Sequence, residues 1–150
     1  CPGQIVLSGD ADKMDAACEA AKAAGAKRAI PLPVAGAYHS PLMQPAQAGL
    51  AEALAKVELR EPSVPVYSNV TGQAHAGAAS IAGTMVDQVT SSVRWEACIR
   101  AMIADGVTRF IELGPGTALT GFMRRIDRGL EVLNVADNDS LAKSAEALNA

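Results

Sequence analysis

Residues 108–135 read TRFIELGPGTALTGFMRRIDRGLEVLNV, and this stretch decides the fold class. Residues 108–113 and 130–135 are short apolar runs that predict strands. Gly-Pro-Gly at residues 114–116 predicts a turn, and residues 117–126 predict a helix. A strand, a helix and a second strand in this order predict two parallel strands joined by a right-handed crossover.

The rest of the chain continues this alternation of strands and helices. Further helices are expected at residues 42–57, 81–89, 95–104 and 140–148, and a strand at 64–67. Ahead of them lie an expected strand at residues 4–8, a helix at 10–24 capped by Asp10 and ended by Gly25, and a strand at 27–32. We therefore expect an α/β fold with a small strand–helix–strand unit in residues 1–34 and a parallel-sheet unit in residues 35–150.

Composition excludes several classes of protein. Hydrophobic residues make up 49% of the 150 residues, enough for a core. The net charge of −3 argues against a dedicated nucleic-acid binder, which needs a basic patch. No run of eighteen apolar residues predicts a membrane span. Three cysteines without a CxxC pair (Cys1, Cys18 and Cys98) predict reduced thiols in a cytoplasmic protein, with no metal site.

One loop carries the strongest candidate for catalysis. Residues 34–41 combine glycine, alanine and proline without helical periodicity, and they place His39 after an expected strand. Imidazole changes protonation near neutral pH, so His39 could serve as a general base; the alternative is a surface or helix-capping histidine. None of the nine serines lies in a G-x-S-x-G turn. On these residues alone, the catalytic machinery is incomplete.

Other conspicuous residues favour structural roles. Cys18 and Cys98 fall inside expected helices, which disfavours a cysteine nucleophile paired with His39. The turn at residues 114–116 could bind an anion at the start of a helix, but its glycines more simply serve the backbone. Trp95 is expected in the core and His75 in solvent. Three arginines are expected to be favourable charges near a helix C-terminus: Arg124, Arg125 and Arg128.

Six segments taken together resemble the malonyl-CoA:acyl-carrier-protein transacylase family. They are CPGQIVLSG (1–9), AGAKRAIPLP (24–33), GAYHSPLM (36–43), PVYSNVTG (65–72), the positions Gln88, Val93 and Trp95, and ELGPGTALTG (112–121). The segments follow the family's order over nearly the whole chain. The resemblance implies the C-terminal part of an α/β-hydrolase-like core in residues 35–150. It also implies a remnant of the family's ferredoxin-like small subdomain in residues 1–34.

The resemblance also implies a function in fatty acid biosynthesis. In the family, a serine takes malonyl from malonyl-CoA, and the pantetheine thiol of acyl carrier protein then removes it. A histidine is the base in both steps. His39 matches that histidine, and Gln88 matches the position whose backbone carbonyl holds the ring. Tyr38 is the bulky neighbour that goes with malonyl rather than methylmalonyl. No bound cofactor is implied, since coenzyme A arrives with the substrate.

The serine, the oxyanion-hole glutamine and the malonate-binding arginine of the family would lie upstream of this chain. We therefore expect an inactive fragment whose partners are malonyl-CoA, acyl carrier protein and the missing N-terminal half, with no nucleic acid or membrane. The chain opens without Met, as an interior segment would. Two alternatives remain: an acyltransferase domain cut from a polyketide or fatty-acid synthase, and a non-catalytic α/β binding module. The absence of a linker after Leu148 favours a stand-alone enzyme over a synthase domain.

Overall fold

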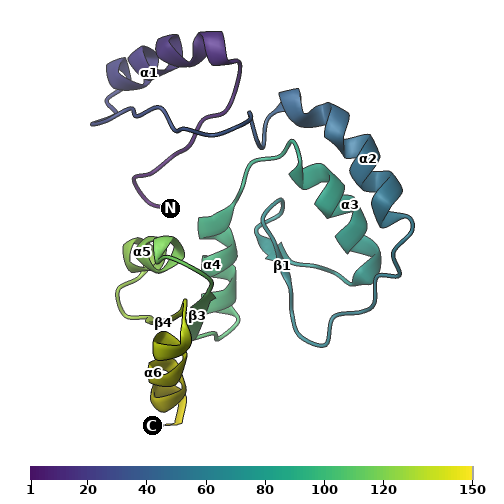
Figure 1. Ribbon diagram of the computed structural model, residues 1–150, viewed down its shortest axis with the longest axis vertical. Helices are drawn as coiled ribbons and strands as arrows, with labels where there is room; N and C mark the ends of the chain where they lie inside the picture. The colour runs from purple at the N-terminus through teal and green to yellow at the C-terminus, as the bar shows by residue number, and fades with distance from the viewer. Residues whose placement is uncertain (150) are drawn as a thin grey trace. The chain divides into compact units, whose positions relative to one another are not determined.

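The computed structural model describes residues 1–149, and it shows helices with short strands (Figure 1). The mixed α/β class expected from the sequence is confirmed. The residues form two compact units, each with most of its contacts inside itself. The first comprises Cys1–Ile5, Thr71–Ala74 and the residues from Arg94 onward; the second comprises Val6–Val70 and His75–Val93.

The first unit contains the parallel strands that the sequence predicts. Strand β3 (Arg109–Leu113) pairs in parallel with β4 (Glu131–Val135), with Arg109 opposite Glu131 and Leu113 opposite Val135. The helix between them is α5 (Ala118–Ile126). The unit also holds β2 (Gln73–Ala74), α4 (Trp95–Ala104) and α6 (Asn138–Asn149), and α6 packs against β4.

The core of the first unit is small and aliphatic. Ile99 from α4 packs with Met123 and Ile126 from α5, and all three side chains are buried. Met123 and Ile126 lie three residues apart, so they share one face of the helix. Trp95 packs against this cluster, as expected from the sequence.

Glu112, at the end of β3, forms the N-terminal cap of α5. Its carboxylate accepts hydrogen bonds from the backbone N–H groups of Leu119 and Thr120, at 3.0 and 2.9 Å, and from the Thr120 hydroxyl at 2.6 Å. The turn between cap and helix requires glycine, because Gly114 and Gly116 have φ of 132° and 88°. A side chain of the protein therefore occupies the amides that an anion would use, which supports the structural role of this turn.

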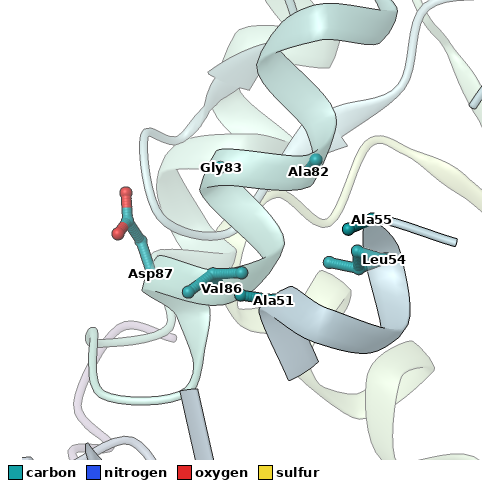
Figure 2. A pocket seen from close by; sticks show the side chains of 7 residues that line it. All are labelled: Ala51, Leu54, Ala55, Ala82, Gly83, Val86 and Asp87. Atoms are coloured by element: carbon teal, nitrogen blue, oxygen red, sulfur yellow. The ribbon is translucent and has the colours of Figure 1, made fainter. Parts of the chain in front are cut away.

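The second unit is mostly helical. It contains η1 (Ala11–Lys13), α1 (Met14–Ala23), η2 (Pro41–Met43), α2 (Gln44–Leu54), β1 (Tyr67–Ser68) and α3 (Ala78–Gln88). Helices α2 and α3 lie side by side (Figure 1). Figure 2 shows the groove between them, where small residues such as Ala51, Ala82 and Gly83 leave little side chain between the helices.

Several local predictions at the start of the chain are wrong. Residues 4–8 and 27–32 form no strand, and their apolar side chains are exposed: Ile5 by 86% and Ile30 by 65%. A strand needs a neighbour for its backbone groups, and the described residues offer these segments none. The strand expected at residues 64–67 shrinks to the two residues of β1. Asp10 precedes η1 but makes no side-chain capping hydrogen bond.

Within residues 1–149, no helix is long and apolar enough to cross a membrane.

The cap on α5 predicts a pH-dependent stability. Hydrogen bonds from the Thr120 side chain and from the Thr120 and Leu119 amides hold the pKa of Glu112 below its ordinary value. The charged cap therefore stabilises the fold above the unfolded pKa of about 4.3, and this contribution disappears as the pH falls through the lowered folded pKa. Glu112→Gln should unfold at lower urea than the unchanged chain at pH 7, and the two midpoints should converge in acid.

Glu146→Gln, at an exposed position of α6, is the matched control and should leave the urea midpoint unchanged at both pH values. Equal midpoints for Glu112→Gln and the unchanged chain at pH 7 would contradict the role of Glu112.

Candidate active site

A tight turn holds His39 in an unusual backbone conformation. The φ of His39 is 61°, and among the described residues it is the one non-glycine residue with a positive φ. The Ser40 hydroxyl donates to the Ala37 carbonyl across the turn at 2.7 Å, and Ser40 is buried. A left-handed backbone conformation at a residue other than glycine costs about 1–3 kcal/mol of folding free energy, and such residues are common at functional sites. The turn therefore indicates that the direction of the His39 side chain matters.

The imidazole of His39 is fixed by a backbone carbonyl. Its Nδ1 lies 3.0 Å from the carbonyl oxygen of Gln88, across 49 residues of sequence. A carbonyl oxygen can only accept a hydrogen bond, so Nδ1 must carry the proton. In the neutral ring Nε2 then holds a free lone pair. His39 is exposed, so this lone pair is available to take a proton from a reacting group.

The amide side chain of Gln88 does not compete for this role. Its Nε2 lies 3.4 Å from Nδ1 of His39, but two donors cannot bond each other. The amide donates instead to the Ser91 carbonyl at 3.0 Å. The structure therefore brings His39 together with the main chain of Gln88, and the side chain of Gln88 supports the loop that follows.

The end of helix α3 explains why this carbonyl is available. Gln88 is the last residue of α3, and the final carbonyls of a helix have no partner within it. The Asp87 carbonyl accepts from the N–H groups of Thr90 and Ser91, which leaves the Gln88 carbonyl to His39. Local sequence patterns alone gave no reason to select Gln88, and only the family resemblance pointed to it.

Sequence reasoning missed Gln47, which reaches the same helix end. The Gln47 amide donates to the Val86 carbonyl at 3.0 Å and to the Thr90 hydroxyl at 3.3 Å. Gln47 lies three and seven residues before Leu50 and Leu54, so it continues the apolar stripe of α2 toward its start. The sequence signal for Gln47 is a polar residue at the N-terminal end of the apolar face of a helix.

Tyr38, the expected substrate-binding residue, is half-exposed beside His39. Its ring lies over Gly36, where an added side chain would meet the ring at 3.5 Å. The aromatic surface is therefore accessible to a ligand at the same turn that carries the histidine.

His75 is not the solvent-exposed residue that the sequence suggested. It is half-buried, and its Nδ1 lies 3.3 Å from the Thr84 hydroxyl and 3.5 Å from the Ser80 hydroxyl. Its backbone N–H donates to the Val66 carbonyl at 2.8 Å, which ties the residue to the segment just before β1. These contacts give His75 a structural role.

The remaining candidates make structural contacts. Burial raises the pKa of the Cys98 thiol, which keeps it protonated and a poor nucleophile. Arg125 donates to the Gln4 side chain at 3.0 Å, so it joins α5 to the start of the chain. Among the described residues, no three His, Cys, Asp or Glu side chains gather as metal ligands would.

Comparisons with known proteins place the chain in a family. The family described as "Acyl transferase domain" matches residues 1–144. A malonyl CoA-acyl carrier protein transacylase of Bacillus subtilis is 43% identical over 148 residues, which are 99% of this chain and 47% of the relative. The chain thus spans about half the length of the curated relatives it matches.

Solved structures agree. The crystal structure of MCAT from Streptococcus pneumoniae superimposes with a TM-score of 0.87 at 37% identity, over 93% of this chain and 45% of that one. A type II PKS acyl-carrier protein in complex with its malonyl-transacylase contains a chain with a TM-score of 0.88 at 37% identity, over 93% of this chain and 45% of that one. With the family match over nearly its full length, the chain belongs to the acyl transferase domain family.

Proposed function

We propose that this chain is the C-terminal part of a malonyl-CoA:acyl-carrier-protein transacylase and supplies its catalytic base. The observation that carries the proposal is the hydrogen bond from His39 Nδ1 to the Gln88 carbonyl, which leaves Nε2 as the proton acceptor. Relatives named malonyl CoA-acyl carrier protein transacylase, at 43% and 39% identity, support the choice of reaction. His39 and Gln88 are the residues we assign to catalysis.

The mechanism follows from a base with its lone pair on Nε2. In the first half-reaction, Nε2 of His39 takes the proton of a serine hydroxyl, and the serine oxygen attacks the thioester carbonyl of malonyl-CoA. The C–S bond breaks, the coenzyme A sulfur takes the proton from His39, and the serine is left as a malonyl ester. In the second, His39 takes the proton of the pantetheine thiol, whose sulfur displaces the serine oxygen, and the proton returns to that oxygen.

The Gln88 carbonyl helps each time His39 gains a proton. The ring then becomes an imidazolium, and its Nδ1–H bond to the carbonyl becomes charge-assisted and stronger. The same bond keeps Nε2 directed at the reacting atoms. This role needs only the main chain of Gln88.

Tyr38 would set the choice of acyl group. Its half-exposed ring belongs to the residue just before the base, and in this proposal it crowds a substituent on the α-carbon of the acyl chain. Malonyl has no such substituent, whereas methylmalonyl does. Malonyl is therefore the substrate we assign to this site.

The proposal extends to the architecture of the whole enzyme. Residues 35–150 would complete an α/β-hydrolase-like core, and residues 1–34 a ferredoxin-like subdomain. Exposed apolar side chains in the extended segments near Ile5 and Ile30 support it, because strands of an N-terminal half would cover them. The upstream half would also bring the serine. No bound cofactor is part of the proposal, and the widely spaced cysteines fit a cytoplasmic location.

One similar structure suggests a second kind of carrier protein as the acceptor. The partner in one similar solved complex is a type II PKS acyl-carrier protein. A transacylase serving polyketide synthesis is therefore the second candidate, with the same chemistry at His39. Transfer rates to carrier proteins of the two pathways from the source organism distinguish them.

The role of His39 can be tested against that of Gln88 in the full-length enzyme. His39→Ala should lower kcat/KM for malonyl transfer on the order of 10²–10⁴-fold, the usual worth of a general base. Gln88→Ala keeps the carbonyl that holds the ring and should stay much closer to the unchanged enzyme. The measurement is transfer of labelled malonyl from malonyl-CoA to acyl carrier protein. Losses of equal size in the two variants would show that the side chain, rather than the main chain, of Gln88 matters.

The division of the active site can be tested by mixing. This chain alone should transfer no malonyl, because none of its serines lies in the G-x-S-x-G turn of a nucleophile. A mixture with a separately expressed N-terminal half should transfer malonyl. Co-elution of the two halves on gel filtration is the control for assembly. Transfer by this chain alone that disappears in His39→Ala would overturn the expected division.

The left-handed backbone conformation of His39 should cost stability. Both His39→Gly and His39→Ala remove the imidazole, but only glycine accepts a φ of 61° without strain. His39→Gly should therefore be more stable than His39→Ala by about 1 kcal/mol in urea unfolding. At Tyr38, where φ is not positive, the order should reverse, because glycine there only adds freedom to the unfolded chain. The same order at both positions would contradict the strain.

A further inference from the structure

The amide of Gln47 contacts the helix end that holds the catalytic base. Gln47 lies in α2 and is half-buried. Its Nε2 donates to the Val86 carbonyl at 3.0 Å and to the Thr90 hydroxyl at 3.3 Å, across 39 and 43 residues of sequence. A primary amide has two N–H donors, and these two acceptors use both.

The two acceptors bracket Gln88. Val86 lies two residues before it and Thr90 two residues after it. The Val86 carbonyl belongs to the last turn of α3, where helical partners run out, and its backbone contact from the Val89 N–H is long, at 3.3 Å. Gln47 therefore supplies the shorter of the two hydrogen bonds to this carbonyl and restrains the helix end on both sides of Gln88.

The same amide is tied closely to His39 along the chain. After His39 come Ser40, the short helix η2 (Pro41–Met43) and then α2, so no long loop separates His39 from Gln47. Ser40 is itself held to Ala37 by a 2.7 Å hydrogen bond. Gln47 thus connects the segment that carries the base to the helix end that carries its acceptor carbonyl.

Small residues make up much of the packing between the two helices. Figure 2 shows Val86 and Ala51 facing each other across the groove, which is otherwise lined mainly by small residues. Alanine offers a methyl group and glycine only a hydrogen atom, so these residues make few van der Waals contacts between the helices. The two hydrogen bonds of the Gln47 amide add a directional restraint between the helices next to Gln88.

We propose that Gln47 is a positioning residue, which sets the distance between His39 Nδ1 and the Gln88 carbonyl by holding the end of α3 against the start of α2. The inference rests on the proposed function, because it treats that distance as a property of the catalytic base. Gln47 touches neither substrate nor reacting atoms, and it acts through His39.

The test is a double-mutant cycle in the full-length enzyme. Gln47→Met keeps the length of the side chain and removes both hydrogen bonds. It should lower kcat/KM for malonyl transfer on the order of tenfold, as displacement of a catalytic group does. In a His39→Ala background the same substitution should change the residual rate less than about twofold, because the group it positions is gone. Gln44→Met, at an exposed position of the same helix, should change neither rate.

Two further measurements keep folding and function apart. Thermal unfolding of Gln47→Met should show an intact fold. The ¹⁵N resonances of the His39 ring should move toward those of a free imidazole in Gln47→Met and stay unchanged in Gln44→Met, whether or not the enzyme transfers malonyl.

Each outcome decides the proposal. A loss specific to the His39 background, together with shifted ring resonances, supports it. Equal losses in both backgrounds show a merely structural role and overturn it. Unchanged ring resonances in Gln47→Met overturn it as well. Failure of the unchanged enzyme to transfer malonyl sinks the proposed function, and the ring resonances then still report whether Gln47 positions His39.

Discussion

The hydrogen bond between His39 Nδ1 and the Gln88 carbonyl is the interaction on which the site depends. It joins residues 49 positions apart, and it selects one of the two neutral tautomers of histidine, which leaves the lone pair on Nε2. The acceptor is a carbonyl that helix α3 cannot satisfy itself, so the way the helix ends also determines where the imidazole of His39 is held. The left-handed turn at His39 aims the ring at that carbonyl.

Much of the fold follows from local sequence because its signals are local. Strands β3 and β4 and the helix between them appear where residues 108–135 predict them, since each element carries its own apolar period and turn residues. Helix α4 occupies the predicted residues, Trp95–Ala104. The strands expected at residues 4–8 and 27–32 are absent, because a strand depends on a neighbour that its own sequence does not encode.

The site was less accessible to sequence reasoning than the fold. His39 stood out by its loop and its residue type, but a main-chain acceptor such as that of Gln88 leaves no mark on the side chain. Gln47 escaped notice because its role depends on the packing of two helices. Glu112 shows the same limit: its carboxylate caps a helix whose first residue, Ala118, lies six positions further along the chain. Contacts across long sequence distances set these roles.

The tautomer of His39 tests most directly whether the Gln88 carbonyl holds the ring. The ¹⁵N and attached-proton resonances of its ring, assigned in the otherwise unchanged full-length enzyme with His39→Ala as the reference, report which nitrogen carries the proton. The hydrogen bond to the Gln88 carbonyl predicts a proton on Nδ1 and none on Nε2 in the neutral ring. A neutral ring protonated on Nε2 would mean that the Gln88 carbonyl does not hold it, and His39 could not then take a proton as proposed.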